Sequence, residues 1–210
     1  PGTCSATHVL LEQVPGSRQR ISAVSFSGQM MGAVLLDRSA VPVRPAIIWA
    51  DTRSDAQSSQ LVDRVGMAEG YRITGHRINA TYSLSKVMWV RDNEPEVFAA
   101  ARHCLCAKDY IAYRFTGVLA TDPSDASGTN AFDQRAGSWS GLMLDAAGID
   151  AALFPEIVES TTVIGTVTAA AAAESGLIAG TPVVMGGGDG PMAALGAGVV
   201  DSTSGAYAYL

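Results

Sequence analysis

The stretch of this sequence whose residue types are best suited to chemistry is 183–192, in which three consecutive glycines precede the carboxylate of Asp189. Asp189 is the only charged residue between Glu174 and Asp201. The apolar run 183–185 is typical of a buried strand, and the alanine-rich segment after it could open a helix. A carboxylate at the C-terminal end of a strand lies where open α/β sheets bind ligands. Glycines tolerate positive φ, so they let the backbone turn sharply and approach a ligand closely.

Asp189 also has a simpler interpretation. Aspartate is a common N-cap residue, because its side chain accepts hydrogen bonds from the free amides of a helix's first turn. The pattern of segment 183–192 is compatible with both a ligand contact and an N-cap. Residues elsewhere in the chain have to decide between them.

A second group of potential ligands is formed by His103, Cys104 and Cys106. Side chains alternate along a strand, so both thiols would lie on one face and pack into the core. A structural zinc site needs four ligands, and no second cluster in the sequence completes this set. We therefore expect a core strand here and no metal site.

Composition and charge narrow the classes of function. The chain has 210 residues, of which 48% are hydrophobic and 16% are charged, as in globular proteins. Its formal net charge of −6 disfavours nucleic acid and anionic membrane surfaces as partners. The sequence has no run of about 18 apolar residues and does not open with a signal-peptide pattern. Its 3 cysteines cannot pair evenly, which favours a reducing compartment, and we expect a cytoplasmic protein.

Strand patterns alternate with helical patterns along the chain, which predicts an α/β layered domain. Apolar spacing and helix-end signals predict helices over 4–13, 51–65, 84–91, 96–101, 107–115, 139–147 and 169–174. Alternating or continuous apolar runs predict strands over 21–27, 33–37, 46–49, 104–106, 163–167 and 183–185. The first two strands flank a polar turn that contains glycine, so we expect them to pair as a hairpin. The polar cluster 121–129 is expected to form a turn.

Local signals mark several helix ends. Thr168 is expected to cap the N-terminus of the helix over 169–174, and Gly176 is expected to end it. Gly117 and Gly148 are expected to end helices in the same way.

Several segments, taken together, resemble the FGGY family of carbohydrate kinases, and the xylulokinases within it most closely. They span 27–32, 44–53, 107–110, 124–129 and 182–189. A glycine-rich loop that ends in aspartate is common, so one such segment would be a weak signal. Five segments in the family's order and rough spacing, over essentially the whole chain, are a specific one.

The resemblance implies a ribonuclease-H-like (actin-like ATPase) α/β domain, in which helices flank a mixed sheet and two such domains close on sugar and MgATP. Residues 1–210 would then be the N-terminal sugar-binding domain without its first strands, which carry a phosphate-contacting turn. The C-terminal nucleotide-binding domain would be absent. The expected cofactors are ATP and Mg2+, and the chain by itself is expected to be inactive.

The resemblance also assigns roles around the glycine-rich segment. Asp189 matches the catalytic aspartate, which accepts the proton of the attacking sugar hydroxyl. Gly186, Gly187 and Gly188 would leave room for the γ-phosphate to approach that hydroxyl. The resemblance therefore favours a catalytic role for Asp189 over a role as an N-cap alone, and a capping residue can also be catalytic.

On the sugar side, Gln29, Met30 and Met31 match the segment whose backbone and side chains line the sugar site. Asp51 and Arg53 match the family's substrate-side segment. Amide and carboxylate groups suit vicinal hydroxyls, and the wrong sugar would leave such buried groups unpaired. Two alternatives remain. Asp51 could be a helix N-cap with Arg53 as its surface neighbour, and Gln29 could satisfy turn amides.

The predicted activity is ATP-dependent phosphorylation of a sugar hydroxyl, with D-xylulose as the first substrate and xylulose 5-phosphate as the product. Xylulokinases usually carry histidine at the position of Met31, and a thioether cannot donate the hydrogen bond that an imidazole can. Another pentulose, a polyol or a sugar acid is therefore an alternative substrate. A non-catalytic sugar-binding module of kinase descent is an alternative function. The expected partner is a small-molecule sugar, and a homodimer is compatible with the sequence.

Overall fold

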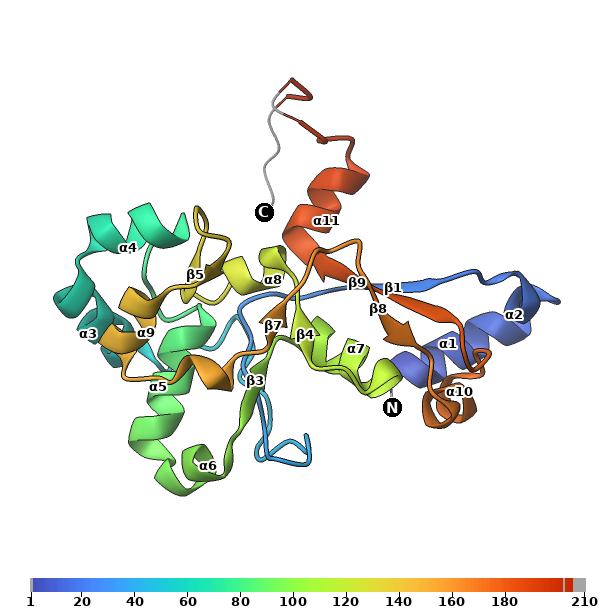
Figure 1. Cartoon of the computed structure of the whole chain (residues 1–210), viewed down its shortest axis with the longest axis horizontal. Coiled ribbons are helices and arrows are strands. Elements are labelled where there is room, and N and C mark those ends of the chain that lie inside the picture. Colours follow the sequence, from blue (N-terminus) through green and yellow to red (C-terminus); the bar gives the residue numbers. More distant parts are fainter. Residues whose placement is uncertain (1, 202, 206–210) are drawn as a thin grey trace.

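The computed structural model describes residues 2–201 and 203–205, and Figure 1 shows its two regions. One region is built around a three-stranded sheet and the other mainly from helices, with short strand pairs between them. The strands are β1 (Val24–Gly28), β2 (Val34–Leu36), β3 (His103–Leu105), β4 (Ala120–Thr121), β5 (Phe132–Asp133), β6 (Ser138–Trp139), β7 (Glu156–Ile157), β8 (Val163–Thr166) and β9 (Pro182–Gly188). The helices are α1 (Gly2–Gln13), α2 (Ser17–Arg20), α3 (Asp55–Val65), α4 (Met67–Thr74), α5 (Ser83–Asn93), α6 (Pro95–Ala100), α7 (Ala107–Thr116), α8 (Pro123–Ser127), α9 (Gly141–Ala147), α10 (Ala169–Ser175) and α11 (Asp189–Gly196), with one 3-10 turn at Ala151–Leu153.

The central sheet has the strand order β1-β9-β8. β1 runs parallel to β9, and β8 runs antiparallel to β9 at the edge of the sheet, which confirms the predicted strand over 163–167. Val183 and Met185 are fully buried on one face of β9. α7 covers this face, where Phe115 packs with Val183 and Ala112 packs with Met185.

The predicted hairpin of strands 21–27 and 33–37 is wrong. β1 pairs with β9, whereas β2 pairs antiparallel with β3. All residues of β2 are buried, while Ser25 and Ser27 of β1 are exposed. The two strands therefore belong to different layers of the molecule, and the segment between them is a connection rather than a tight turn.

The predicted strand over 46–49 is also wrong, because Ile47 makes only an isolated antiparallel bridge with Ala33. Pro45 has no amide hydrogen to donate, so the pairing is interrupted there and resumes only at Val43, whose amide donates to the Leu35 carbonyl oxygen at 3.0 Å.

The polar cluster 121–129 forms the expected turn only at its end, at residues 128–129, because its middle is the short helix α8. Asp122 caps this helix, since its side chain accepts hydrogen bonds from the amides of Ser124 and Asp125. Proline at the first helical position then suits a helix start.

The predicted helices are confirmed, with shifts at their ends. α3 begins at Asp55 rather than at Asp51, and α9 begins at Gly141 because the residues before it form β6. Thr168 caps α10 through its side chain, as predicted. The predicted helix-ending glycines all adopt the left-handed conformation, at Gly117, Gly148 and Gly176.

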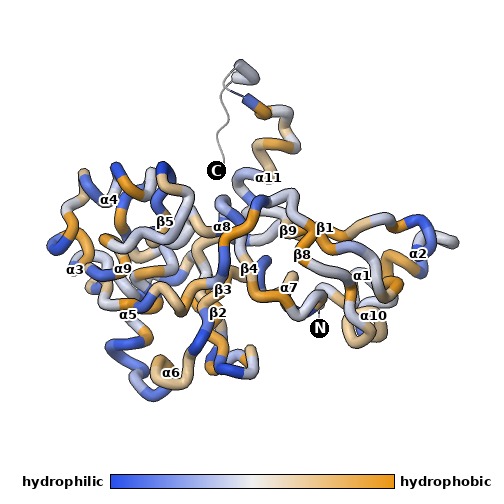
Figure 2. Tube along the Cα trace, viewed as in Figure 1, coloured by the Kyte–Doolittle hydropathy of each residue, from blue (hydrophilic) through white to orange (hydrophobic). Residues whose placement is uncertain are grey.

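A large apolar cluster lies among the helices of the second region. Leu61 of α3, Leu84 and Met88 of α5, and Met143 of α9 are fully buried in it. Apolar positions alternate with hydrophilic ones along α3 and α4, as expected for helices with one buried face (Figure 2). Among residues 2–201 and 203–205, no helix has the length and apolar character needed to cross a membrane.

Candidate functional site

The edge of the sheet where β1 and β9 end is the candidate active site. The two strands run parallel, with Gly28 opposite Gly188, so the residues that follow them leave the sheet at the same edge. Gln29 and Met30 follow Gly28, and Asp189 follows Gly188. Met30 packs so closely on β9 that a Cβ atom on Gly188 would lie 2.4 Å from the Met30 Cγ atom. The structure therefore brings the segment that begins at Gln29 together with Asp189.

Asp189 is the first residue of α11 and is half-buried. The N-cap of this helix is Gly188, so the N-cap interpretation of Asp189 is wrong. The Asp189 Oδ1 atom accepts a hydrogen bond of 3.0 Å from the amide of Gly190. The helix dipole also favours a carboxylate at this position, because the N-terminal end of a helix is positive.

The three glycines before Asp189 lie within β9, which corrects the expected turn after the strand. Gly186 has a φ of +73°, and a Cβ atom there would lie 2.0 Å from the carbonyl oxygen of Phe26. A Cβ atom on Gly187 would lie 3.0 Å from the Oγ atom of Ser124. The contact with the β1 backbone therefore requires Gly186 to lack a side chain, whereas Gly187 faces side-chain atoms of Met192 and Ser124. The room that they would leave for a γ-phosphate stays a prediction.

Lys86 on α5 connects two of the segments that were expected to line the sugar site. Its side chain is fully buried. Its ammonium group donates hydrogen bonds to the carbonyl oxygens of Met31 (2.9 Å), Trp49 (3.4 Å) and Thr81. Met31 has a φ of +65°, in the left-handed region that is unfavourable for a residue with a side chain. Burial lowers the pKa of Lys86 to about 8, although the nearby charge of Asp51 acts to raise it.

Asp51 and Arg53 pair with each other. The Arg53 Nε atom lies 2.9 Å from Asp51 Oδ1 and 3.0 Å from Oδ2, and the Nη2 atom lies 2.6 Å from Oδ2. These side-chain hydrogen bonds, together with one of 3.0 Å from the Arg53 backbone amide to Oδ1, lower the pKa of Asp51 to about 2. The N-cap of α3 is Ser54, so the capping alternative for Asp51 is wrong. The Arg53 guanidinium also lies 4.9 Å from the centre of the Trp89 ring, in a cation–π contact.

Beside the same edge of the sheet, the ammonium group of Lys108 lies among three buried carboxyl groups. Its Nζ atom is 2.7 Å from Asp109, 3.1 Å from Asp122 and 3.3 Å from Asp125. The side chains of all four residues are at most 1% exposed. Burial alone would lower the pKa of Lys108, but the surrounding carboxylates outweigh it and raise that pKa.

A chain of hydrogen bonds leads from this cluster to the residue before Asp189. The Asp122 Oδ2 atom accepts hydrogen bonds from the hydroxyl groups of Ser124 (2.5 Å) and Ser160 (2.8 Å). The Gly188 amide in turn donates to the Ser124 Oγ atom at 2.8 Å. Ser124 therefore holds the start of α11, and with it Asp189, against a buried ionic cluster.

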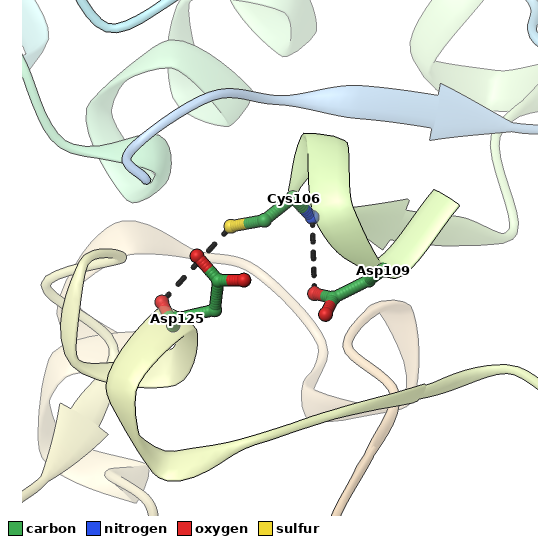
Figure 3. A group of neighbouring side chains, drawn as sticks. All are labelled: Cys106, Asp109 and Asp125. Carbon is green, nitrogen blue, oxygen red and sulfur yellow. Dashed lines mark hydrogen bonds between the residues drawn. The ribbon is translucent and has the colours of Figure 1, made fainter. Parts of the chain in front are cut away.

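Cys106, Asp109 and Asp125 point toward one another, and their candidate ligand atoms lie within 4.8 Å of each other (Figure 3). The group does not suit a metal ion, because Lys108 already places a cation against both carboxyl groups. Burial also raises the pKa of Asp125 and that of the Cys106 thiol, which disfavours the deprotonated forms that bind a metal. A neighbouring cavity of about 10 Å³ is at the lower limit for a single water molecule.

The sequence patterns did not identify Lys86, Lys108 or Ser124 as site residues. The sequence did contain one signal for the two lysines. Lys86 and Lys108 are the only lysines in the sequence, and each lies next to residues that were expected in the core. Lysine is rarely buried unless its charge is paired, so such positions indicate internal partners. The partners themselves were hidden, since the Met31 carbonyl lies 55 positions from Lys86 along the chain.

Comparison with known proteins gives a consistent result for most of the chain. A family model described as "FGGY family of carbohydrate kinases, N-terminal domain" matches residues 3–196. The xylulose kinase of Bacillus subtilis (strain 168) is 38% identical over 182 residues, which cover 87% of this chain and 36% of that protein. The chain thus spans little more than a third of the length of this relative.

Solved structures of carbohydrate kinases share the fold. The xylulose kinase from Rhodospirillum rubrum superposes with a TM-score of 0.90 at 28% identity, over 95% of this chain and 41% of that one. The gluconate kinase from Lactobacillus acidophilus superposes with a TM-score of 0.86 at 27% identity, over 93% of this chain and 39% of that one. These similarities confirm the predicted ribonuclease-H-like (actin-like ATPase) α/β fold.

Proposed function

Since the chain belongs to the FGGY family of carbohydrate kinases, we propose that it is the sugar-binding part of an ATP-dependent sugar kinase. The proposed reaction converts D-xylulose into xylulose 5-phosphate. The observation that carries the proposal is the shared edge of β1 and β9, where Met30 lies against the glycine that precedes Asp189. A sugar bound along segment 29–31 would have its hydroxyl groups beside that carboxylate.

In this reaction Asp189 is the general base. Its carboxylate accepts the proton of the sugar hydroxyl while the hydroxyl oxygen bonds to the γ-phosphorus of ATP and ADP departs. Mg2+ would neutralise part of the phosphate charge. The hydrogen bond of 2.8 Å from the Gly188 amide to Ser124 keeps the start of α11 in place, so the carboxylate is positioned before the sugar arrives.

The Asp51–Arg53 pair supplies a second group for the sugar. Because Arg53 lowers the pKa of Asp51 to about 2, this carboxylate is ionised at neutral pH and can only accept hydrogen bonds. The side-chain amide of Gln29 can both donate and accept. A sugar that lacks a hydroxyl at the matching position would leave such groups unpaired, which lowers its kcat/KM.

Two similarities bear on the identity of the sugar. The relatives named above include xylulose kinases, which favours D-xylulose as the first candidate. The agreement with a gluconate kinase, at almost the same identity as with the Rhodospirillum enzyme, makes a sugar acid the second candidate.

A coupled assay of ATP consumption by the full-length gene product tests the proposal. The panel contains D-xylulose, L-ribulose, glycerol and D-gluconate. We expect turnover, with the highest kcat/KM for D-xylulose. No turnover with any ketose, polyol or sugar acid would reject the kinase activity, and a preference for D-gluconate would replace the first substrate candidate by the second.

The base is tested by Asp189→Asn. We expect kcat to fall by about 10²–10⁴-fold, the usual contribution of a general base, while sugar affinity changes by a few-fold at most. Asp63→Asn, a substitution at an exposed position of α3, is the matched control and should change neither quantity. Equal activity of Asp189→Asn and the control would reject the assignment of the base.

A further inference from the structure

We propose that Lys86 is a positioning residue for the sugar site, whose ammonium group holds three backbone segments in the arrangement that binds the sugar. The proposal rests on the proposed function for the identity of the site. It adds a residue outside the segments that were expected to contact the sugar. It also predicts that sugar affinity depends on the protonation of this lysine.

The three acceptors of Lys86 come from three different connections. Met31 lies in the connection after β1, Trp49 lies in the segment that leads to α3, and Thr81 lies just before α5. An ammonium group has three hydrogens, so one cation satisfies all three carbonyl oxygens. The first two connections contain the residues that we assign to the sugar, Gln29 to Met31 and Asp51 with Arg53.

The ammonium group of Lys86 stabilises an unfavourable backbone conformation at Met31. Its φ of +65° is unfavourable for a residue with a side chain, so it persists only where surrounding contacts hold it. The carbonyl oxygen of Met31 accepts the 2.9 Å hydrogen bond from Lys86. Two further hydrogen bonds join the same connections, from the Ala33 amide to Ile47 (2.9 Å) and from the Ile47 amide to Ala33 (3.1 Å). Lys86 therefore acts beside the only point at which these connections pair as a bridge in the described chain.

Removal of the proton from Lys86 breaks this arrangement. A neutral amine has two hydrogens and one lone pair, so one of the three carbonyl oxygens would lose its donor and face the lone pair instead. A buried carbonyl without a donor is costly, and the strained connection at Met31 can move to relieve it.

The charged and titratable groups around Lys86 identify it as the group that changes charge above neutral pH. Asp51 faces it from the segment before α3, and its pKa of about 2 keeps it ionised. Cys106 faces it from the start of α7, and burial raises the pKa of this thiol, so it stays neutral. Tyr82, next to Thr81, also has a pKa raised by burial. Burial lowers the pKa of Lys86 itself to about 8.

Sugar affinity is expected to fall as Lys86 loses its proton, whereas the free energy of unfolding should rise with pH. The pKa of Lys86 is about 8 in the folded chain and 10.5 for an unperturbed lysine, so between these values the unfolded chain binds more protons. Stability therefore rises with pH in this window as far as Lys86 is concerned. A loss of sugar affinity above pH 8 that comes from Lys86 is thus separable from unfolding.

The first measurement is the KM for D-xylulose of the full-length protein between pH 7 and 9.5, at saturating ATP. If only the protonated form binds the sugar, the apparent affinity falls with the protonated fraction, by up to about tenfold per pH unit above the pKa. In Lys86→Met we expect a raised KM at pH 7 that no longer changes over this range. Arg102→Met also removes a cation that donates to backbone carbonyls, at an exposed position away from this site, and should keep the wild-type profile.

The second measurement does not depend on activity. Hydrogen exchange of the Ala33, Ile47 and Asp51 amides reports on the connections directly, because each of these amides donates within them. Their protection factors, corrected for the intrinsic effect of pH, should fall about tenfold in wild type between pH 7 and 9.5 and in Lys86→Met at pH 7, in line with the loss of one buried hydrogen bond. Arg102→Met should keep wild-type protection. The wild-type titration needs no variant, so the test holds even if Lys86→Met does not fold.

The outcomes separate the two proposals. Turnover of sugar with a KM and protection factors that do not change above pH 8 would overturn the role of Lys86 and leave the kinase activity intact. Loss of protection above pH 8 without turnover of any sugar would support the positioning by Lys86 and reject the kinase activity. A parallel loss of protection and affinity, with no loss of thermal stability, supports both.

Discussion

Replacement of Gly186 by alanine tests whether the glycine run before Asp189 is required by the sheet itself. Gly186 has a φ of +73°, and a Cβ atom there would lie 2.0 Å from the carbonyl oxygen of Phe26 on β1. The left-handed conformation costs an alanine about 1–2 kcal/mol. Because the clash is with backbone, β1 and β9 must also move apart, and such overpacking costs about 1–3 kcal/mol more. We therefore expect the free energy of unfolding to fall by about 2–5 kcal/mol in total.

Gly180→Ala is the matched control. Gly180 has a φ of +88°, and no atom of the described chain lies within 4 Å of an added Cβ, so only the conformational cost applies. Urea unfolding of both variants gives the two free energies, provided that their m-values agree. The difference between the variants isolates the contact with Phe26. A difference below about 0.5 kcal/mol, the usual error of such comparisons, would refute the reasoning.

Three other substitutions test the polar networks of the site. Ser124→Ala removes the acceptor of the Gly188 amide, and we expect kcat for D-xylulose to fall about tenfold, with KM within about twofold, in the coupled assay. Lys108→Met leaves buried carboxylates unpaired and should lower the free energy of unfolding by about 3–5 kcal/mol in urea titrations. Arg53→Met should raise the pKa of Asp51 from about 2, as measured by NMR titration of the carboxyl carbon, but not fully to the value of a free carboxyl group, because the backbone amide of residue 53 still donates to Asp51 Oδ1. Asp51 contributes stability above pH 3.8 that is lost as the pH falls towards 2, and the part of it that comes from the Arg53 side chain should disappear in this variant.

The control for Ser124→Ala is Ser160→Ala. Ser160 donates to the same carboxylate oxygen of Asp122 but has no hydrogen bond to the Gly188 amide, so kcat should change by less than about twofold. An equal loss of kcat in both variants would show that Ser124 acts through the ionic cluster rather than through the amide.

The control for Lys108→Met is Arg72→Met, which breaks an exposed ion pair with Glu69 and should cost at most about 1 kcal/mol. Equal costs for the two substitutions would contradict the idea that the buried carboxylates depend on Lys108. For the third substitution, a pKa of Asp51 that does not change in Arg53→Met would show that another group keeps this carboxylate ionised.

The helices could be predicted because their signals are local, whereas the strand pairing could not. Thr168 and Gly176 mark the two ends of α10 within a few residues of it, and both act as expected. The partner of β1 lies far along the chain, with Val24 opposite Val183. The turn after Ser27 has the composition of a hairpin turn, and nothing local shows that β2 is buried and pairs elsewhere.

The candidate site also has parts that could be predicted from the sequence and parts that could not. The segment that contains Gln29 and the segment that contains Asp189 are each an unbroken run of residues, so their resemblance to a family could be recognised from the sequence. The parallel strands β1 and β9 bring the two segments to one edge of the sheet. The contacts that position these segments could not be predicted, because several of the partners are backbone atoms. The carbonyl of Met31 and the amide of Gly188 carry no residue-type signal that would point to Lys86 or to the hydroxyl that holds the amide.

The choice of lysine at both internal positions follows from the shape of its charged group. Each arginine of the chain is at least partly exposed, whereas Lys86 and Lys108 are at most 2% exposed. In each case three oxygen acceptors converge on one point, as carbonyls around Lys86 and as carboxyl groups around Lys108. A compact ammonium group with three donors matches such a site, while a planar guanidinium with five donors needs a wider one. The contacts of Lys86 hold the connections that we assign to the sugar, whereas those of Lys108 lead through Asp122 and Ser124 to the start of α11. Because buried charges are screened by salt much less than exposed ones, this positioning should persist at ionic strengths that weaken the ion pairs at the surface.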